Sequence, residues 1–112
     1  MSNENHLSVV LQTLEVEINA INRANGWNVL TPAAWDDPHH IPTVLALIHS
    51  EVSEALEGFR HNDRENFAEE LADVFIRLLD CTGGLGIDIA PVILAKMAKN
   101  RTRGLHHGGK RV

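Results

Sequence analysis

Four stretches of the chain repeat apolar side chains every three or four residues, which is the spacing of an amphipathic helix. The first stretch predicts a helix over about residues 7–24, with Asn25 and Gly26 as its end. The second predicts a helix that has Pro42 in its first turn and runs to about His61. The segment between these helices follows neither a helical nor a strand period and contains prolines and both tryptophans, so we expect an ordered loop.

The other two stretches lie in the second half of the chain. Asn62 or Asp63 is suited to cap the third helix, because a short polar side chain can accept from the free backbone amides of the first turn. The Thr-Gly-Gly run at 82–84 is typical of a helix end. Asp88 predicts the cap of a fourth helix, which we expect Gly104 to break.

Four helices joined by short connections predict an all-α fold, a four-helix bundle. The length fits one domain over residues 1–112, with a basic, glycine-rich tail at 104–112. Aromatic residues make up only 4% and tyrosine is absent, which favours helices over a β-sandwich. A bundle of this size has a thin core, and the apolar faces of the second and third helices are broad. We therefore expect a homo-oligomer, either a homodimer or a dimer of dimers.

Charge and cysteine content exclude several classes of protein. The formal net charge of -5 argues against general binding of nucleic acid through its phosphates, which needs a surplus of Lys and Arg. The single cysteine excludes an internal disulfide. No apolar stretch is long enough to cross a bilayer, and the N-terminus lacks the pattern of an export signal. We expect a cytoplasmic protein that has neither membrane nor nucleic-acid partners.

Two pairs of acidic residues occupy the second and third predicted helices. Glu51 and Glu54 are three residues apart, as are Glu70 and Asp73, so each pair lies on one face of its helix. Helices joined by a tight turn run antiparallel, and the two pairs can then face each other. Four negative charges in one space repel unless a cation joins them. Oxygen ligands without His or Cys favour Mg²⁺, with Mn²⁺ as a substitute. The alternative is two solvated acidic helix faces.

A basic face follows on the fourth predicted helix. Lys96, Asn100 and Arg103 are four and three residues apart and share one side of the helix. Lys and Arg suit the phosphates of a triphosphate, and Asn100 suits either a phosphate or a base. The alternative is that these cations only complement the dipole at the C-terminal end of the helix.

Several residues outside these two groups also enter the site hypothesis. Trp27 and Trp35 lie in the loop ahead of the second helix, where either ring can stack on a nucleobase or simply cover the core. We favour Trp35 for stacking, because prolines restrict the loop just ahead of that helix. His107 and Lys110 lie in the C-terminal tail, whose glycines let backbone amides approach bound phosphates, with a disordered terminus as the equal alternative. Arg77 stands four residues after Asp73, which predicts an ion pair along the helix, with contact to a phosphate as the alternative.

The spacing Glu51-x-x-Glu54, fifteen intervening residues, then Glu70-x-x-Asp73 resembles the metal-binding signature of the MazG-like all-α nucleoside triphosphate pyrophosphohydrolases. The stretches LALIHSEVSEALEGFR and EELADVFIRLLD look like the second and third helices of that family. The C-terminal run KMAKNRTRGLHHGGKR is similar to the end of the family's domain. The resemblance covers roughly residues 40–112 and is weaker before them.

This resemblance implies magnesium-dependent hydrolysis of a nucleoside or deoxynucleoside triphosphate to the monophosphate and pyrophosphate, with water attacking the α-phosphorus. It also implies that the four carboxylates carry the metal. Many members begin the first motif with two adjacent acids, whereas here Ser50 precedes Glu51. We expect Glu51 to act as the general base for the attacking water.

Two other functions compete with hydrolysis. The missing acid at position 50 leaves room for a non-catalytic nucleotide-binding bundle with a regulatory role. A di-iron carboxylate bundle would use Glu-x-x-His motifs, and neither His49 nor His61 stands three residues after a glutamate. The sequence therefore argues against the di-iron bundle and leaves the regulatory bundle as the alternative.

Overall fold

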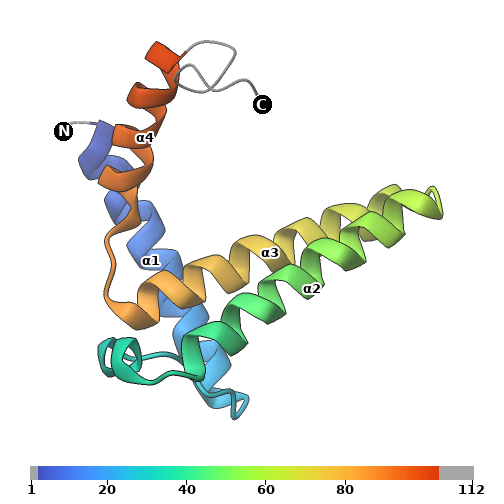
Figure 1. Ribbon diagram of the computed structural model, residues 1–112, viewed down its shortest axis with the longest axis horizontal. Coiled ribbons are helices and arrows are strands. Elements are labelled where there is room, and N and C mark those ends of the chain that lie inside the picture. Colours follow the sequence, from blue (N-terminus) through green and yellow to red (C-terminus); the bar gives the residue numbers. More distant parts are fainter. Residues whose placement is uncertain (1–2, 104–112) are drawn as a thin grey trace.

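The computed structural model describes residues 3–103, and the regular structure in this part of the chain is entirely helical (Figure 1). The elements are α1 (Asn3–Ala24), the short 3-10 helix η1 (Pro32–Asp36), α2 (His40–Arg60), α3 (Arg64–Leu85) and α4 (Ile89–Arg103). The prediction of an all-α chain with four helices is confirmed for these residues. None of these helices alone has the length and hydropathy of a membrane span, although α3 and α4 taken together, across a bend of 117°, reach both.

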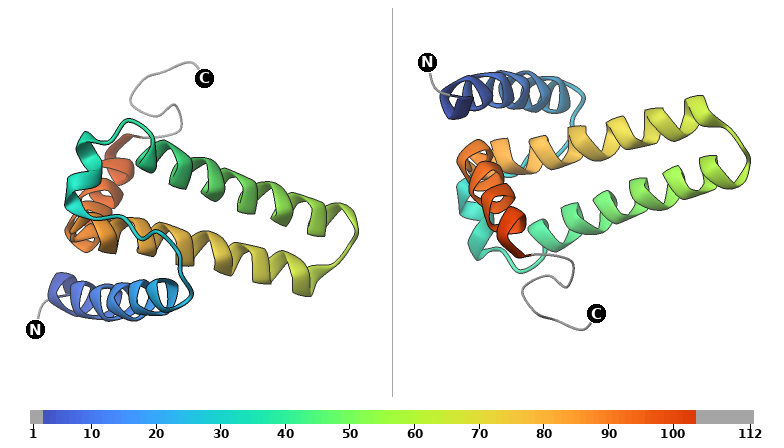
Figure 2. Two further views of the ribbon diagram at one scale, coloured as in Figure 1. Left: turned by 90° about the horizontal axis from the view of Figure 1, so that it is seen from below. Right: turned by 90° about the horizontal axis from the view of Figure 1, so that it is seen from above.

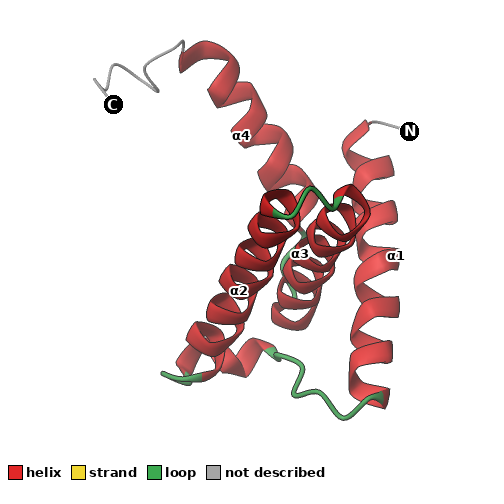
Figure 3. Cartoon of the chain, turned by 90° about the vertical axis from the view of Figure 1, so that its right-hand side faces the viewer, coloured by secondary structure: helices red, strands yellow, loops and turns green. Residues whose placement is uncertain are grey.

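The helices pack in the order α2, α3, α1, α4, so the bundle is open on one side (Figure 2, Figure 3). α2 and α3 form a long antiparallel hairpin, and α1 lies against α3. The first turns of α4 lie beside α1, while its far end points away from the hairpin (Figure 1). η1 contacts both α2 and α3 at the base of the hairpin. The two helices that carry the acidic pairs are therefore direct neighbours.

The hairpin turn is built from Asn62 and Asp63. Asn62 adopts the left-handed region with a φ of 53°, which asparagine tolerates better than most residues. Asp63 caps α3, because its Oδ1 accepts a hydrogen bond from the backbone amide of Asn66 at 3.0 Å. The amide of Asp63 donates to the carbonyl of Gly58 at 2.8 Å. Asp63 is thus the cap among the two predicted residues, and the turn sends α3 back along α2.

Two predicted helix ends are wrong. α1 begins at Asn3 rather than at residue 7, because polar residues extend the helix without adding to its apolar repeat. α3 continues through the glycine pair and ends before Gly86, which takes the left-handed conformation with a φ of 74°. A Cβ at Gly83 would lie 2.8 Å from a side-chain carbon of α1, and one at Gly84 would lie 2.5 Å from the carbonyl oxygen of Leu30. These glycines serve close packing, and the helix does not end at them.

Two buried polar side chains fix α1 on α3. Thr82 Oγ1 donates to Glu15 Oε1 at 2.8 Å, and Asn19 Nδ2 donates to Asp80 Oδ1 at 2.6 Å. Glu15 and Asn19 are only 6% and 7% exposed, so losing either bond would leave a buried polar group without its partner. These bonds set the register of α1 along α3.

Few apolar residues are buried in the described part of the chain. They are Val29, Leu30, Ala34, Ala55 and Ala90. Three of the five belong to the segment between α1 and α2, which packs against the base of the hairpin. This packing explains why the predicted loop is ordered and contains η1.

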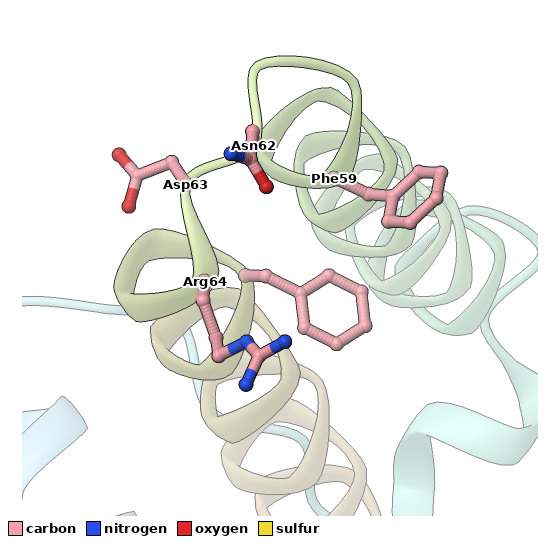
Figure 4. Close-up of a pocket in the computed structure, with 5 residues that line it drawn as sticks. Phe59, Asn62, Asp63 and Arg64 are labelled. Carbon is pink, nitrogen blue, oxygen red and sulfur yellow. The ribbon is translucent and has the colours of Figure 1, made fainter.

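One face of the hairpin is apolar and exposed. Its side chains recur at helical spacing along α2 and α3 and are between 39% and 71% exposed. We call this surface the outer hairpin face, and its residues are Leu45, Val52, Leu56, Phe59, Leu71, Phe75 and Leu78. α1 docks on a different side of α3, through Asp80 and Gly83. The face ends at the hairpin tip, where Phe59 and Arg64 border an open pocket of about 430 Å³ (Figure 4).

Candidate metal centre

Three carboxylates meet in the space between α2 and α3. Glu51 of α2 and Glu70 and Asp73 of α3 each offer an oxygen, and these oxygens all lie within 4.8 Å of one another. They meet because Glu51 belongs to the buried side of α2 that faces α3, together with Ala55 and Gly58. The structure thus brings together three of the four predicted metal ligands.

Glu54, the fourth predicted ligand, lies at the edge of this group. It is exposed, one helical turn beyond Glu51, and its carboxyl group is within hydrogen-bond reach of Glu70. Glu70 is therefore flanked by both glutamates of α2. This arrangement leaves Glu54 on the solvent side of the cluster.

The cluster has buried acceptor atoms that no hydrogen bond satisfies. Glu51 Oε2 and Glu70 Oε2 are shielded from solvent and have no donor among the described residues. Once protonated, Glu70 can share its proton in a hydrogen bond with Glu51 or with Glu54; this sharing, followed by desolvation and the nearby negative charges, raises the pKa of Glu70 to about 7. A proton shared between carboxyl groups, or a cation, would satisfy these oxygens. All the candidate ligand atoms are hard carboxylate oxygens, so the residues fit a divalent cation such as Mg²⁺ or Mn²⁺.

Arg77 pairs with Glu51 across the hairpin. Its Nε donates to Glu51 Oε1 at 3.0 Å, and the two side chains are only 20% and 12% exposed. The prediction of an ion pair along α3 with Asp73 is wrong, because the arginine side chain points toward α2 and reaches the deeper carboxylate. The guanidinium carbon also lies 5.0 Å from the ring centre of Trp27.

A pocket of about 330 Å³ adjoins the carboxylates. Its walls come from the end of α1, the following segment, α2 and α3, and its lining residues are Asn22, Trp27, Glu51, Asp73, Ile76, Arg77 and Asp80. Trp27, the less favoured of the two candidate tryptophans, is the one that lines this pocket, because the chain folds back here in a way that its local sequence pattern does not indicate. Trp35, the predicted stacking residue, lies on η1, is 78% exposed and is not part of this lining.

The predicted phosphate-binding residues of α4 are not next to the carboxylates. Lys96, Asn100 and Arg103 are exposed, and α4 packs on α1 rather than on the hairpin. Lys96 borders a different hollow, formed by α4 itself. His107 and Lys110 lie outside the described residues. Within one chain the structure therefore gathers the predicted acids and leaves the basic residues of α4, Lys96 and Arg103, apart from them.

Comparison with known proteins identifies the family. The model of the MazG nucleotide pyrophosphohydrolase domain matches residues 40–107, more than half of the chain, and the match contains all four acids. No curated protein and no solved structure gives a significant match. The matched segment includes the whole hairpin and α4, so it covers the elements that build the carboxylate cluster. The chain belongs to the MazG nucleotide pyrophosphohydrolase family.

Proposed function

We propose that this protein hydrolyses a nucleoside or deoxynucleoside triphosphate to the monophosphate and pyrophosphate, with Mg²⁺ held by Glu51, Glu54, Glu70 and Asp73. The observation that carries the proposal is the pair of buried, unsatisfied carboxylate oxygens on facing helices, beside an open pocket. A family of nucleotide pyrophosphohydrolases supplies the reaction class. When bound, Mg²⁺ supplies positive charge that offsets the negative charge of the triphosphate.

The reaction balances without a further reactant. Water attacks the α-phosphorus, the bond from that phosphorus to the oxygen bridging to the β-phosphorus breaks, and pyrophosphate leaves. A carboxylate takes the proton of the attacking water, and we assign this role to Glu51. Ser50, where many members of the family carry an acid, does not serve as a base, because a neutral hydroxyl is far less basic than a carboxylate; its hydroxyl donates to the carbonyl of Leu47 at 2.7 Å.

The pocket beside the cluster suits the nucleoside part of the substrate. Its volume of about 330 Å³ falls at the lower end of the range of small-molecule sites, which is about 300–1,000 Å³. The Trp27 ring offers an aromatic wall for a base, while Asn22 and Asp80 offer hydrogen-bonding groups for the base or sugar. We therefore place the base against Trp27 rather than Trp35.

We propose that a second copy of the chain covers the outer hairpin face. Only five apolar residues are buried in the described part of the chain, whereas the seven of the outer hairpin face remain in contact with solvent. A continuous apolar surface on two adjacent helices marks an interface, because its burial is favourable and its exposure promotes association. Packing one hairpin on another would complete a four-helix bundle. This geometry argues for a homodimer, or a dimer of such dimers.

A second copy would also supply the missing basic side chains. α4 points away from the carboxylates of its own chain (Figure 1) and presents Lys96, Asn100 and Arg103 to solvent. Lys and Arg are favourable partners for a triphosphate. We propose that α4 of one copy contributes phosphate contacts to the site of another.

The test of the function is release of pyrophosphate from a panel of standard and modified nucleotides. We expect turnover of at least one nucleotide with Mg²⁺ or Mn²⁺, loss of turnover on chelation, and loss of turnover in Glu70→Gln. Nucleotide binding without any product would instead identify the non-catalytic regulatory bundle, for which the absence of an acid at position 50 is the supporting observation.

A further inference from the structure

Arg77 links a metal ligand to the segment that follows α1. It donates through Nε to Glu51 and lies over the ring of Trp27. We propose that Arg77 is a positioning residue: it holds Glu51 Oε1 so that Oε2 faces the other carboxylates, and Trp27 holds Arg77. This inference rests on the proposed cation site but adds a role that the four carboxylates alone do not explain.

The hydrogen bond from Arg77 restricts the orientation of the Glu51 carboxylate. A glutamate has three rotatable side-chain bonds, so a free carboxylate would turn to any nearby donor. Here one oxygen is tied at 3.0 Å, and the planar carboxylate then fixes the direction of the other. That other oxygen, Oε2, is buried and without a donor, and the Glu51 carboxylate brings an oxygen within 4.8 Å of oxygens of Glu70 and Asp73. Partners that orient a metal ligand in this way contribute to metal affinity.

Burial and the contact with Trp27 hold the Arg77 side chain in place. Its side chain is 20% exposed, which removes it from most of the screening that weakens surface ion pairs. The guanidinium carbon lies 5.0 Å from the centre of the Trp27 ring, within the range of a cation–π contact. The contact reaches across from α3 to the segment after α1, so the position of that segment is coupled to Glu51.

Positioning and plain electrostatics predict opposite results when the charge is removed. A positive charge near a cation site repels the cation, so removing it alone would tighten metal binding. Removing an orienting hydrogen bond would weaken metal binding instead. The donor is Nε, and the amide nitrogen of glutamine stands at the same place along the side chain, with a proton to donate and no charge. Methionine has a similar length but no donor.

The experiment measures Mn²⁺ affinity of the full chain without nucleotide, by electron paramagnetic resonance, for the wild type, Arg77→Gln and Arg77→Met. We expect Arg77→Met to bind Mn²⁺ about tenfold more weakly, the lower end of the effect of losing an orienting partner. Arg77→Gln should bind close to the wild type and more tightly than Arg77→Met, because it keeps the donor and loses the repelling charge along with the contact to Trp27. Loss of a hydrogen bond to a charged group predicts more than about a threefold change in Mn²⁺ affinity. Affinities of Arg77→Gln and Arg77→Met that differ by less than about threefold would therefore overturn the proposal.

The role of Trp27 is tested in the same assay by a double-mutant cycle. Trp27→Leu should weaken Mn²⁺ binding about threefold in the wild type, as expected from the loss of a modest cation–π contact. It should have no effect in Arg77→Gln, which has no cation to hold. An equal loss in both backgrounds would show that Trp27 does not act through Arg77. Helical circular dichroism of each variant controls for folding.

These outcomes are separate from those that test the function. Because no nucleotide is present, Mn²⁺ affinity reports on the carboxylates whether or not the protein turns over a substrate. Inactivity toward every nucleotide would overturn the proposed function and leave the positioning role intact. Wild-type protein that binds no Mn²⁺ would overturn the cation site and the positioning role together.

Discussion

Glu51 and Glu70 face each other across the α2–α3 hairpin, and each has one buried carboxylate oxygen without a hydrogen-bond donor. Two neighbouring carboxylates repel each other when both are ionised, which favours a proton or a cation between them. Arg77 partners only the other oxygen of Glu51. The pair is therefore arranged for a proton or a cation between the helices.

The first prediction concerns stability and pH. The pKa of Glu70 is raised from 4.5 to about 7, so its protonated form is favoured in the folded protein. This protonated carboxyl contributes to the free energy of unfolding in full below pH 4.5, the pKa in the unfolded chain. The contribution is lost as the pH rises through about 7, the pKa in the folded protein. Without metal, we expect the melting temperature to fall between pH 5 and pH 8, and added Mg²⁺ to restore it at the higher pH. Thermal melts in chelator and in Mg²⁺ measure both effects.

The control for this prediction is Glu70→Gln, which stays neutral at every pH. Its melting temperature in chelator should change less over the same range. A wild-type melting temperature that rises from pH 5 to pH 8 in chelator would contradict the proton-sharing arrangement, because it would mean that the ionised form of Glu70 is the favoured one.

The second prediction separates a general base from a metal ligand. If Glu51 takes the proton, Glu51→Gln should lower turnover by about a hundredfold or more, even at saturating metal and nucleotide. The matched variant Glu54→Gln, one turn along the same helix, should recover most of its turnover when Mg²⁺ is raised. Recovery of Glu51→Gln to the same extent would assign Glu51 to metal binding alone.

The third prediction concerns assembly. A charge buried in an interface without a partner is costly, so Phe75→Glu should shift the protein from dimer to monomer in sedimentation. Val9→Glu is the matched control, because Val9 is similarly exposed but lies on α1, away from the outer hairpin face. Equal dissociation by both substitutions, or by neither, would argue against the outer hairpin face as the interface.

The fourth prediction tests whether α4 acts on another copy. Lys96→Ala and Glu70→Gln should each be nearly inactive alone. After subunit exchange, one site of each mixed dimer would combine intact acids with an intact α4, and random assortment restores about a quarter of the sites of a two-fold dimer.

A mixture of Glu70→Gln with Asp73→Asn is the control for this exchange. Both lesions fall within the same carboxylate cluster, so a mixed dimer contains no intact cluster and stays inactive. No recovery in the Lys96→Ala mixture would mean that α4 does not contribute to the site of a second chain.

Local rules were sufficient for the helices and for the acidic pairs. The spacing of Glu51 with Glu54, and of Glu70 with Asp73, depends only on helical periodicity, and the tight turn at Asp63 makes the two helices antiparallel. The acids then lie close together, because the two helices of a hairpin pack with their buried sides toward each other. The carboxylate cluster was therefore open to prediction before any tertiary structure was known.

Long-range packing decided what the sequence did not reveal. Gly83 and Gly84 look like a helix end but lie inside α3, because α1 and Leu30 approach the backbone there. The same approach carries Trp27 to Arg77, a contact between residues 50 positions apart in the chain that no periodicity encodes. Arg77 likewise pairs with Glu51 on the neighbouring helix and not with Asp73 on the same helix.

The most direct measurement is hydrolysis in ¹⁸O-labelled water with Mg²⁺, followed by mass spectrometry of both products. Attack at the α-phosphorus predicts one labelled oxygen in the nucleoside monophosphate and none in pyrophosphate, and predicts no product from Glu70→Gln. Label in inorganic phosphate or pyrophosphate, or binding of every nucleotide without product, would contradict a pyrophosphohydrolase at this carboxylate site.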